Sequence, residues 1–106
     1  MIHLSIEDKT AKGWLAGPWN SDLPVPVGWA TQGIAKRHVH HHMYEIYLVA
    51  RGTSTAIVNG QETHLQSGDV LVIEPNEVHT FSRSSANYLH FVIQAPFVAG
   101  DKELQD

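Results

Sequence analysis

From Pro26 onward the sequence is a succession of short runs rich in β-branched and aromatic residues, each bounded by turn residues. The runs lack the 3.6-residue period of an amphipathic helix, so they predict strands. The expected strands are residues 25–31, 34–40, 44–50, 53–58, 61–65, 69–73, 78–82 and 88–95. Short strands at this spacing predict an all-β sandwich or barrel rather than an open sheet.

Turn residues separate several of these strands in a way that has a physical reason. Asn59 and Gly60 stand between two strand-like runs, and this pair favours a type I′ hairpin turn, in which both central residues have positive φ. A break is expected at Gly68. Another is expected at Pro75-Asn76, because asparagine tolerates the left-handed conformation.

The two ends of the chain have a weaker strand pattern. Residues 1–24 combine Trp14 and Trp19 with several glycines and prolines, which predicts an irregular arm across the surface of the domain. Residues 97–106 form a polar tail with room for one short helical turn. The length of 106 residues suits one domain, with a barrel core at about 25–95. The tryptophans of the arm could cover a neighbouring barrel, so a homodimer is expected.

Composition excludes several classes of function. Seven basic and eleven acidic residues give a net charge of −4, and no basic run is longer than Lys36-Arg37, so nucleic-acid binding is not expected. The apolar stretches are too short to span a membrane, and the first residues do not resemble a secretory signal. A cytoplasmic location is therefore expected. Without cysteine, neither a disulfide nor a thiolate metal site can form.

Histidine is the unusual component of this sequence. Four of the eight histidines lie within residues 38–42. His38 and His40 are two residues apart, so on a strand they share a face and can bind one ion. Glu45 has the opposite parity and can join them only if residues 41–43 form a bend. The alternative is a solvated histidine-rich loop without any ligand role.

Two motifs in this chain resemble those of the cupin family. The first is His38-x-His40-x4-Glu45-x6-Gly52, and the second runs from Gly68 to His79. The resemblance covers about residues 25–95. It implies a small double-stranded β-helix (jelly-roll) barrel.

The resemblance also implies a metal site, with His38, His40, Glu45 and His79 as the ligands of one divalent transition-metal ion per subunit. Three imidazoles and a carboxylate suit Fe, Mn, Ni, Zn, Co or Cu and argue against calcium or magnesium. The ligands bind only when unprotonated, so the affinity for metal should fall at acidic pH. His41 and His42 would lie around the site or face solvent, and solvent is expected for at least one of them.

The chain departs from the family pattern at four positions, none of which is an implied ligand. Gln32 stands where a glycine usually begins the first motif, and Glu74 stands where proline is common. Asn76 replaces a glycine, which is tolerable because both accept positive φ. Arg83 replaces an asparagine after the last histidine.

Strand parity gives candidates for a substrate pocket beside the metal. Tyr47 and Val49 share a face with Glu45, and Phe81 shares one with His79. In the last strand Tyr88, His90 and Gln94 alternate with apolar residues, and this polar set either faces water, the reading we favour, or lines the pocket. Gln94 is kept as a pocket candidate and His90 as a possible catalytic acid or base.

Trp29 could either wall the pocket or fill the barrel end. Of these two positions, the core position is the one expected.

Two functions are compatible with these features. The first is a metal-dependent enzyme acting on a small organic molecule, with the ion as a Lewis acid or a dioxygen site. Isomerase, lyase, decarboxylase, cyclase and dioxygenase chemistry all fall within this class. The alternative is a non-catalytic module that binds a small ligand or a sugar. The scarcity of Lys and Arg within the barrel motifs disfavours phosphosugar substrates.

Overall fold

The computed structural model describes residues 1–7, 12–33 and 36–105. Their regular secondary structure consists of strands, and no helix in this part of the chain could cross a membrane. In chain order the strands are β1 (Lys12–Ala16), β2 (Val27–Ala30), β3 (His38–His40), β4 (Tyr44–Arg51), β5 (Thr53–Val58), β6 (Gln61–Gln66), β7 (Val70–Ile73), β8 (His79–Ser82), β9 (Leu89–Ala95) and β10 (Lys102–Leu104).

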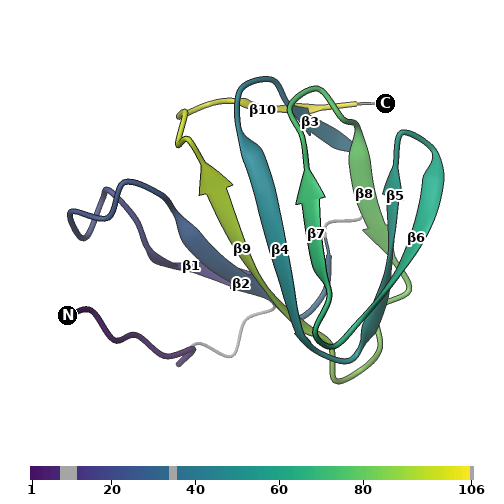
Figure 1. Cartoon of the computed structure of the whole chain (residues 1–106), viewed down its shortest axis with the longest axis horizontal. Helices are drawn as coiled ribbons and strands as arrows, with labels where there is room; N and C mark the ends of the chain where they lie inside the picture. The colour runs from purple at the N-terminus through teal and green to yellow at the C-terminus, as the bar shows by residue number, and fades with distance from the viewer. Residues whose placement is uncertain (8–11, 34–35, 106) are drawn as a thin grey trace.

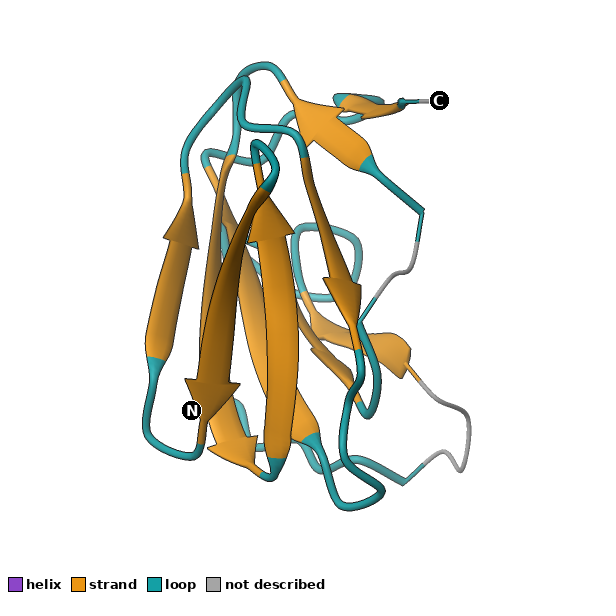
Figure 2. Ribbon diagram, turned by 90° about the vertical axis from the view of Figure 1, so that its right-hand side faces the viewer, coloured by secondary structure: helices purple, strands orange, loops and turns teal. Residues whose placement is uncertain are grey.

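These strands form two five-stranded antiparallel sheets, visible from two directions in Figures 1 and 2. The first sheet has the order β1-β2-β9-β4-β7, and the second has the order β10-β3-β8-β5-β6. Successive strands of the chain repeatedly cross from one sheet to the other. This is the all-β double-stranded β-helix barrel that the sequence predicts.

The hydrophobic core lies between the sheets because alternate residues of each strand point inward. In β4, for example, Tyr47 and Val49 are buried whereas Leu48 is exposed. The core cluster consists of Tyr47, Val49, Ala56, Leu65, Ile73, Phe81, Tyr88 and Val92. It leaves the part of the interior near β3 for polar side chains.

Backbone conformation at the turns agrees with the sequence-based expectations. Asn59 and Gly60 both have positive φ, 49° and 82°, as a type I′ turn requires. Gly68 and Asn76 also adopt positive φ, 92° and 70°. Arg83 has a φ of 52°, which is uncommon for a long side chain and common for the asparagine found there in the family pattern.

The eight expected strands are present with shifted ends, except that residues 34 and 35 lie outside the described residues. The expectation of irregular ends is wrong in two places. Within the arm, β1 pairs with β2, with a register shift between Trp14 and Ala16, and in the tail β10 pairs with β3 in place of a helical turn. Residues 8–11 of the arm and residue 106 of the tail are not among those described.

The aromatic residues of the arm contact their own barrel. The rings of Trp14 and Trp19 meet edge to face at 6.2 Å, and Trp19 lies 6.4 Å from the ring of Phe97. A Cβ on Gly28 would approach the Trp14 ring to 2.7 Å, so the absence of a side chain at this β2 position lets Trp14 lie against it. The arm is therefore an intramolecular edge of the first sheet.

Candidate metal centre

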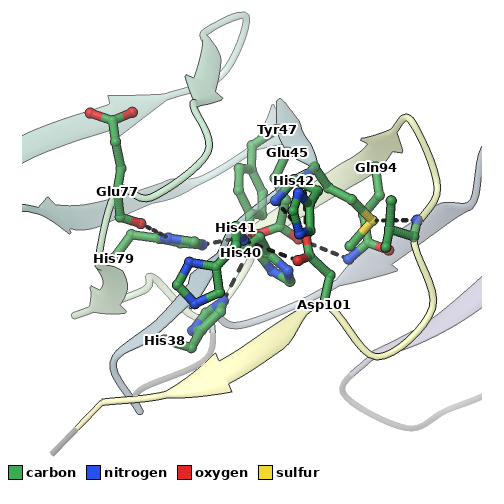
Figure 3. A network of polar contacts seen from close by, with 12 residues as sticks. His38, His40, His41, His42, Glu45, Tyr47, Glu77, His79, Gln94 and Asp101 are labelled. Atoms are coloured by element: carbon green, nitrogen blue, oxygen red, sulfur yellow. Dashed lines mark hydrogen bonds and ion pairs between the residues drawn. The ribbon is translucent and has the colours of Figure 1, made fainter.

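Four side chains from both sheets converge at one end of the core (Figure 3). His38 and His40 come from β3 and His79 from β8, all in the second sheet, whereas Glu45 comes from β4 in the first. One ligand atom from each lies within 4.8 Å of the others, and all four residues are buried. The Glu45 Oε1 atom lies 2.9 Å from His79 Nε2, 3.1 Å from His40 Nε2 and 3.8 Å from His38 Nε2.

The bend required to bring Glu45 to the histidines is present at residues 41–43, between β3 and β4. Asp101, just before β10, holds this bend. Its carboxylate accepts backbone N–H bonds from His41 at 3.1 Å and from His42 and Met43 at 3.0 Å. Burial opposes ionisation of Asp101, but these donors outweigh burial and lower its pKa.

Two of the histidines have their proton positions set by the backbone. The Nδ1 atom of His38 lies 3.0 Å from the Lys36 carbonyl oxygen, and that of His79 lies 2.9 Å from the Glu77 carbonyl oxygen. A carbonyl oxygen only accepts, so Nδ1 carries the proton in both rings. In a neutral ring, Nε2 then presents a lone pair toward the centre of the cluster, as a metal ligand must.

His40 gives independent support for the fit of a metal ion. Both of its ring nitrogens are buried and make no hydrogen bond with the described residues. A buried nitrogen without a partner is costly, whereas a bound cation would satisfy Nε2. The donor set of three imidazoles and one carboxylate therefore fits a divalent transition metal.

Glu45 is held from two further directions. The Tyr47 hydroxyl donates to Oε1 at 3.0 Å, and the Gln94 amide donates to Oε2 at 3.1 Å. Burial alone would raise the pKa of Glu45, but the close approach of His38, His40 and His79 outweighs burial and places the pKa well below its usual range. Burial, followed by the charge of Glu45, raises the pKa of Tyr47, so its hydroxyl keeps its proton.

A cavity of about 440 Å³ opens beside this cluster, a size that suits a small-molecule site. Its lining includes His38, His40 and Glu45 among the four clustered residues. It also includes Tyr47, Phe81, His90 and Gln94 from the residues named by strand parity, whereas Val49 and Tyr88 belong to the core cluster and do not line the cavity. The cavity thus brings the candidate pocket residues and the candidate ligands to one place.

One expectation about the cavity is wrong: the polar set Tyr88, His90 and Gln94 does not face water but is buried. His90 and Gln94 line the cavity, whereas Tyr88 lies behind them in the core cluster. Trp29 is buried as expected of a core residue and also lines the cavity. Both histidines of the bend that are not in the cluster, His41 and His42, are exposed.

Tyr88 and His90 form a buried pair beside the cavity. The Tyr88 hydroxyl lies 2.7 Å from His90 Nδ1. Burial raises the pKa of Tyr88 to about 12 and lowers the pKa of His90 to about 4, so both are neutral at pH 7. When the hydroxyl donates to Nδ1, the imidazole proton lies on Nε2.

Sequence reasoning missed several cavity residues because they lie on the unpredicted strands or near them. Lys12 and Trp14 come from β1, and Lys102 comes from β10. Gln32 also lines the cavity, from the segment that follows β2. In a short strand without alternating polar and apolar residues, the sequence does not indicate which side chains point into the barrel. The orientation of these side chains is set by how the strand pairs with its neighbour.

Comparison with known proteins agrees with this architecture. The family described as "Cupin domain" matches residues 27–93, most of the chain, and the chain therefore belongs to the cupin family. The match includes both motifs and all four clustered residues. No curated protein matches the chain.

Several solved structures share the fold. One of them is Pac13, described as a nucleoside dehydratase, which has also been solved as a Streptomyces protein with uridine. It matches with a TM-score of 0.74 and 16% sequence identity, covering 99% of this chain and 91% of the Pac13 chain. KdgF from Halomonas sp. has a TM-score of 0.68 at 17% identity, over 83% and 79%. An uncharacterised double-stranded β-helix protein from Klebsiella pneumoniae has a TM-score of 0.62 at 32% identity, over 76% and 67%.

Proposed function

We propose that this chain, acting as one domain, is a metal-dependent enzyme that acts on a small organic molecule. One divalent transition-metal ion would be held by His38, His40, Glu45 and His79. The observation that carries this proposal is the convergence of three imidazole Nε2 atoms on one buried carboxylate oxygen. The cavity beside them supports a role on a bound molecule rather than metal storage.

A metal ion bound there would supply Lewis-acid chemistry that polarises a carbonyl or stabilises an enolate, or a dioxygen site if the ion is iron. The protein's own groups have separate tasks. Gln94 and Tyr47 fix the rotamer of Glu45 through its two oxygens. His90 lines the cavity as a neutral imidazole that can give or take a proton at Nε2, with Nδ1 held by Tyr88.

The comparisons support a small-molecule role without identifying the reaction. Pac13 has the same fold and is described as a nucleoside dehydratase, and its structures with uridine indicate that a barrel of this type accommodates a small polar molecule in that protein. The identity of 16% makes this a likeness of fold.

The first experiment is metal analysis of the untagged protein purified without chelator. The native chain should carry close to one transition-metal ion per subunit. His79→Gln should lose it, because removing one ligand of a four-ligand site lowers affinity by at least about tenfold. His42→Gln is the matched control, since it removes an exposed imidazole from the adjacent bend and should keep the metal.

A native chain that cannot be loaded at neutral pH, or equal loading of both variants, would refute the site. Catalysis is separated from simple binding by His90→Gln. If this variant binds metal normally and the native protein converts a substrate, the variant should lose turnover while keeping its affinity. A protein that binds its ligand without converting it would instead be the non-catalytic small-ligand or sugar-binding module.

We also propose that the chain forms a homodimer through the outer face of the first sheet. Tyr44, Leu48, Val70 and Val72 on β4 and β7 are apolar and 36–59% exposed. Leu48 lies beside Val70 in the strand register, so the patch is continuous. Sedimentation should give a dimer for the native chain and a monomer for Val72→Lys. A native monomer at micromolar concentration would refute it.

A further inference from the structure

Two lysines from the edge strands of the two sheets line the cavity. Lys12 belongs to β1, an edge of the first sheet, and Lys102 belongs to β10, an edge of the second. Both residues are exposed, whereas the four clustered residues are buried. The lysines therefore form the solvent side of the cavity, and His38, His40 and Glu45 form its inner end.

The charge of this cavity is opposite in sign to that of the protein. Glu45 is the one acidic residue among the described residues of the lining, and it already faces three histidines. Two ammonium groups outnumber it in a chain whose net charge is −4. A divalent ion at the cluster would make the cavity still more positive. Such local charge attracts and orients anions.

The two lysines are also close enough to affect each other. Burial lowers the pKa of Lys102, and the positive charges of Lys12 and Lys36 lower it further, while Glu45 opposes them. An anion bound in the cavity near both side chains would reduce the repulsion between them.

We propose that the substrate is a small carboxylic acid, whose carboxylate lies between Lys12 and Lys102. The rest of the molecule would lie against aromatic side chains of the cavity and extend toward the candidate metal ligands. This assignment rests on the function proposed above and specifies its substrate class. Trp14, Trp29 and Phe81 supply these aromatic side chains. No arginine is present in the described lining, so the bidentate contacts typical of phosphate recognition are not available there.

The test uses phenylacetate, its uncharged isostere phenylacetamide, and benzylphosphonate as a more highly charged anion. Binding is followed by tryptophan fluorescence, because Trp14 and Trp29 line the cavity. Each ligand is titrated into metal-loaded protein and into chelator-treated protein. The native chain should bind phenylacetate at least about tenfold more tightly than the amide in both forms, since two lysines at a partly exposed rim each contribute a factor of a few.

The lysine variants assign this preference to the rim. Lys102→Gln should weaken phenylacetate binding by about threefold and the double variant with Lys12→Gln by about tenfold, with the amide unchanged. Arg51→Gln is the control, because it removes one positive charge from an exposed position outside the cavity. Both lysines are exposed, so these variants should fold normally.

Equal binding of acid and amide, no binding of either at millimolar concentration, or a preference that survives in the double variant would overturn the proposal. A preference for benzylphosphonate of more than tenfold over phenylacetate would overturn the carboxylate assignment. Failure of the proposed metal site would give a different result. The metal-loaded and chelator-treated preparations would then have the same ligand affinities, while the lysine-dependent preference for phenylacetate persisted.

Discussion

The carboxylate of Asp101 accepts a hydrogen bond from each backbone N–H of the bend at residues 41–43, so Asp101→Ala should reduce both stability and metal binding. The substitution removes three acceptor contacts of 3.0–3.1 Å to successive backbone N–H groups. Each such bond contributes about 1 kcal/mol net. Water can replace the carboxylate at the exposed residues His41 and His42, but not at buried Met43.

These contacts predict a loss of about 2–3 kcal/mol in the free energy of unfolding, or about 10 °C in Tm for a domain of this size. Urea unfolding monitored by fluorescence measures it. Metal affinity should fall by about tenfold or more, because the bend sets the position of Glu45 relative to His38 and His40. Competition with a chelator of known affinity measures the second effect.

The matched control for Asp101→Ala is Glu103→Ala. Glu103 lies on β10, two residues after Asp101, and pairs with the exposed His41 side chain at 2.6 Å. Its removal deletes a negative charge next to the bend but leaves the backbone contacts of Asp101 intact. It should cost less than about 1 kcal/mol. If Asp101→Ala were as stable as the control, or bound metal as tightly as the native chain, the bend would not depend on this carboxylate.

Three further predictions concern other residues. Folding lowers the pKa of Asp101, so the ionised carboxylate stabilises the protein above the unfolded pKa near 3.8, and this stabilisation is lost as the pH falls through the folded pKa. In urea titrations, the free energy of unfolding of Asp101→Asn should therefore be lower than that of the native chain at pH 7 and approach it in acid. Tyr88→Phe should cost about 1–3 kcal/mol in chemical denaturation, because His90 Nδ1 loses its 2.7 Å partner. Thermal melts should show a loss of about 2–4 kcal/mol for Gly52→Ala but only about 1 kcal/mol for Gly60→Ala. Both glycines have positive φ, but only at Gly52 would a Cβ lie 2.7 Å from the Tyr88 backbone. Equal losses for the two variants would contradict this reasoning.

The barrel strands could be predicted because each carries its own local signal. β5 is rich in β-branched residues and is followed directly by Asn59-Gly60, so the hairpin to β6 follows from the sequence alone. The bend before β4 was also predictable, because Glu45 can reach the histidines only if strand parity is interrupted. These features depend on residues close together in the chain.

The edge strands could not be predicted in the same way. β10 contains only Lys102–Leu104, and all three residues are exposed, so no alternation marks it as a strand. It becomes a strand by pairing with β3, about sixty residues earlier, and this also brings Asp101 to the bend. The two lysines of the cavity were missed for this reason.

The faces of β9 show a second limit of sequence reasoning. Alternation separates Tyr88, His90 and Gln94 from their apolar neighbours, but it does not say which set points inward. A polar set normally faces water, and here it is buried because each member has a polar partner: Gln94 donates to Glu45, and Tyr88 pairs with His90. The three-dimensional grouping of polar residues decides the orientation.

The distribution of the clustered residues between the sheets has a consequence for stability. Three histidines lie on the second sheet and Glu45 lies on the first, so an ion bound to all four would act as a cross-link between the two halves of a chain that has no cysteine. Each tenfold rise of free metal above its Kd would then add about 1.4 kcal/mol to the free energy of unfolding. The supply of free metal would therefore set what fraction of the protein is folded.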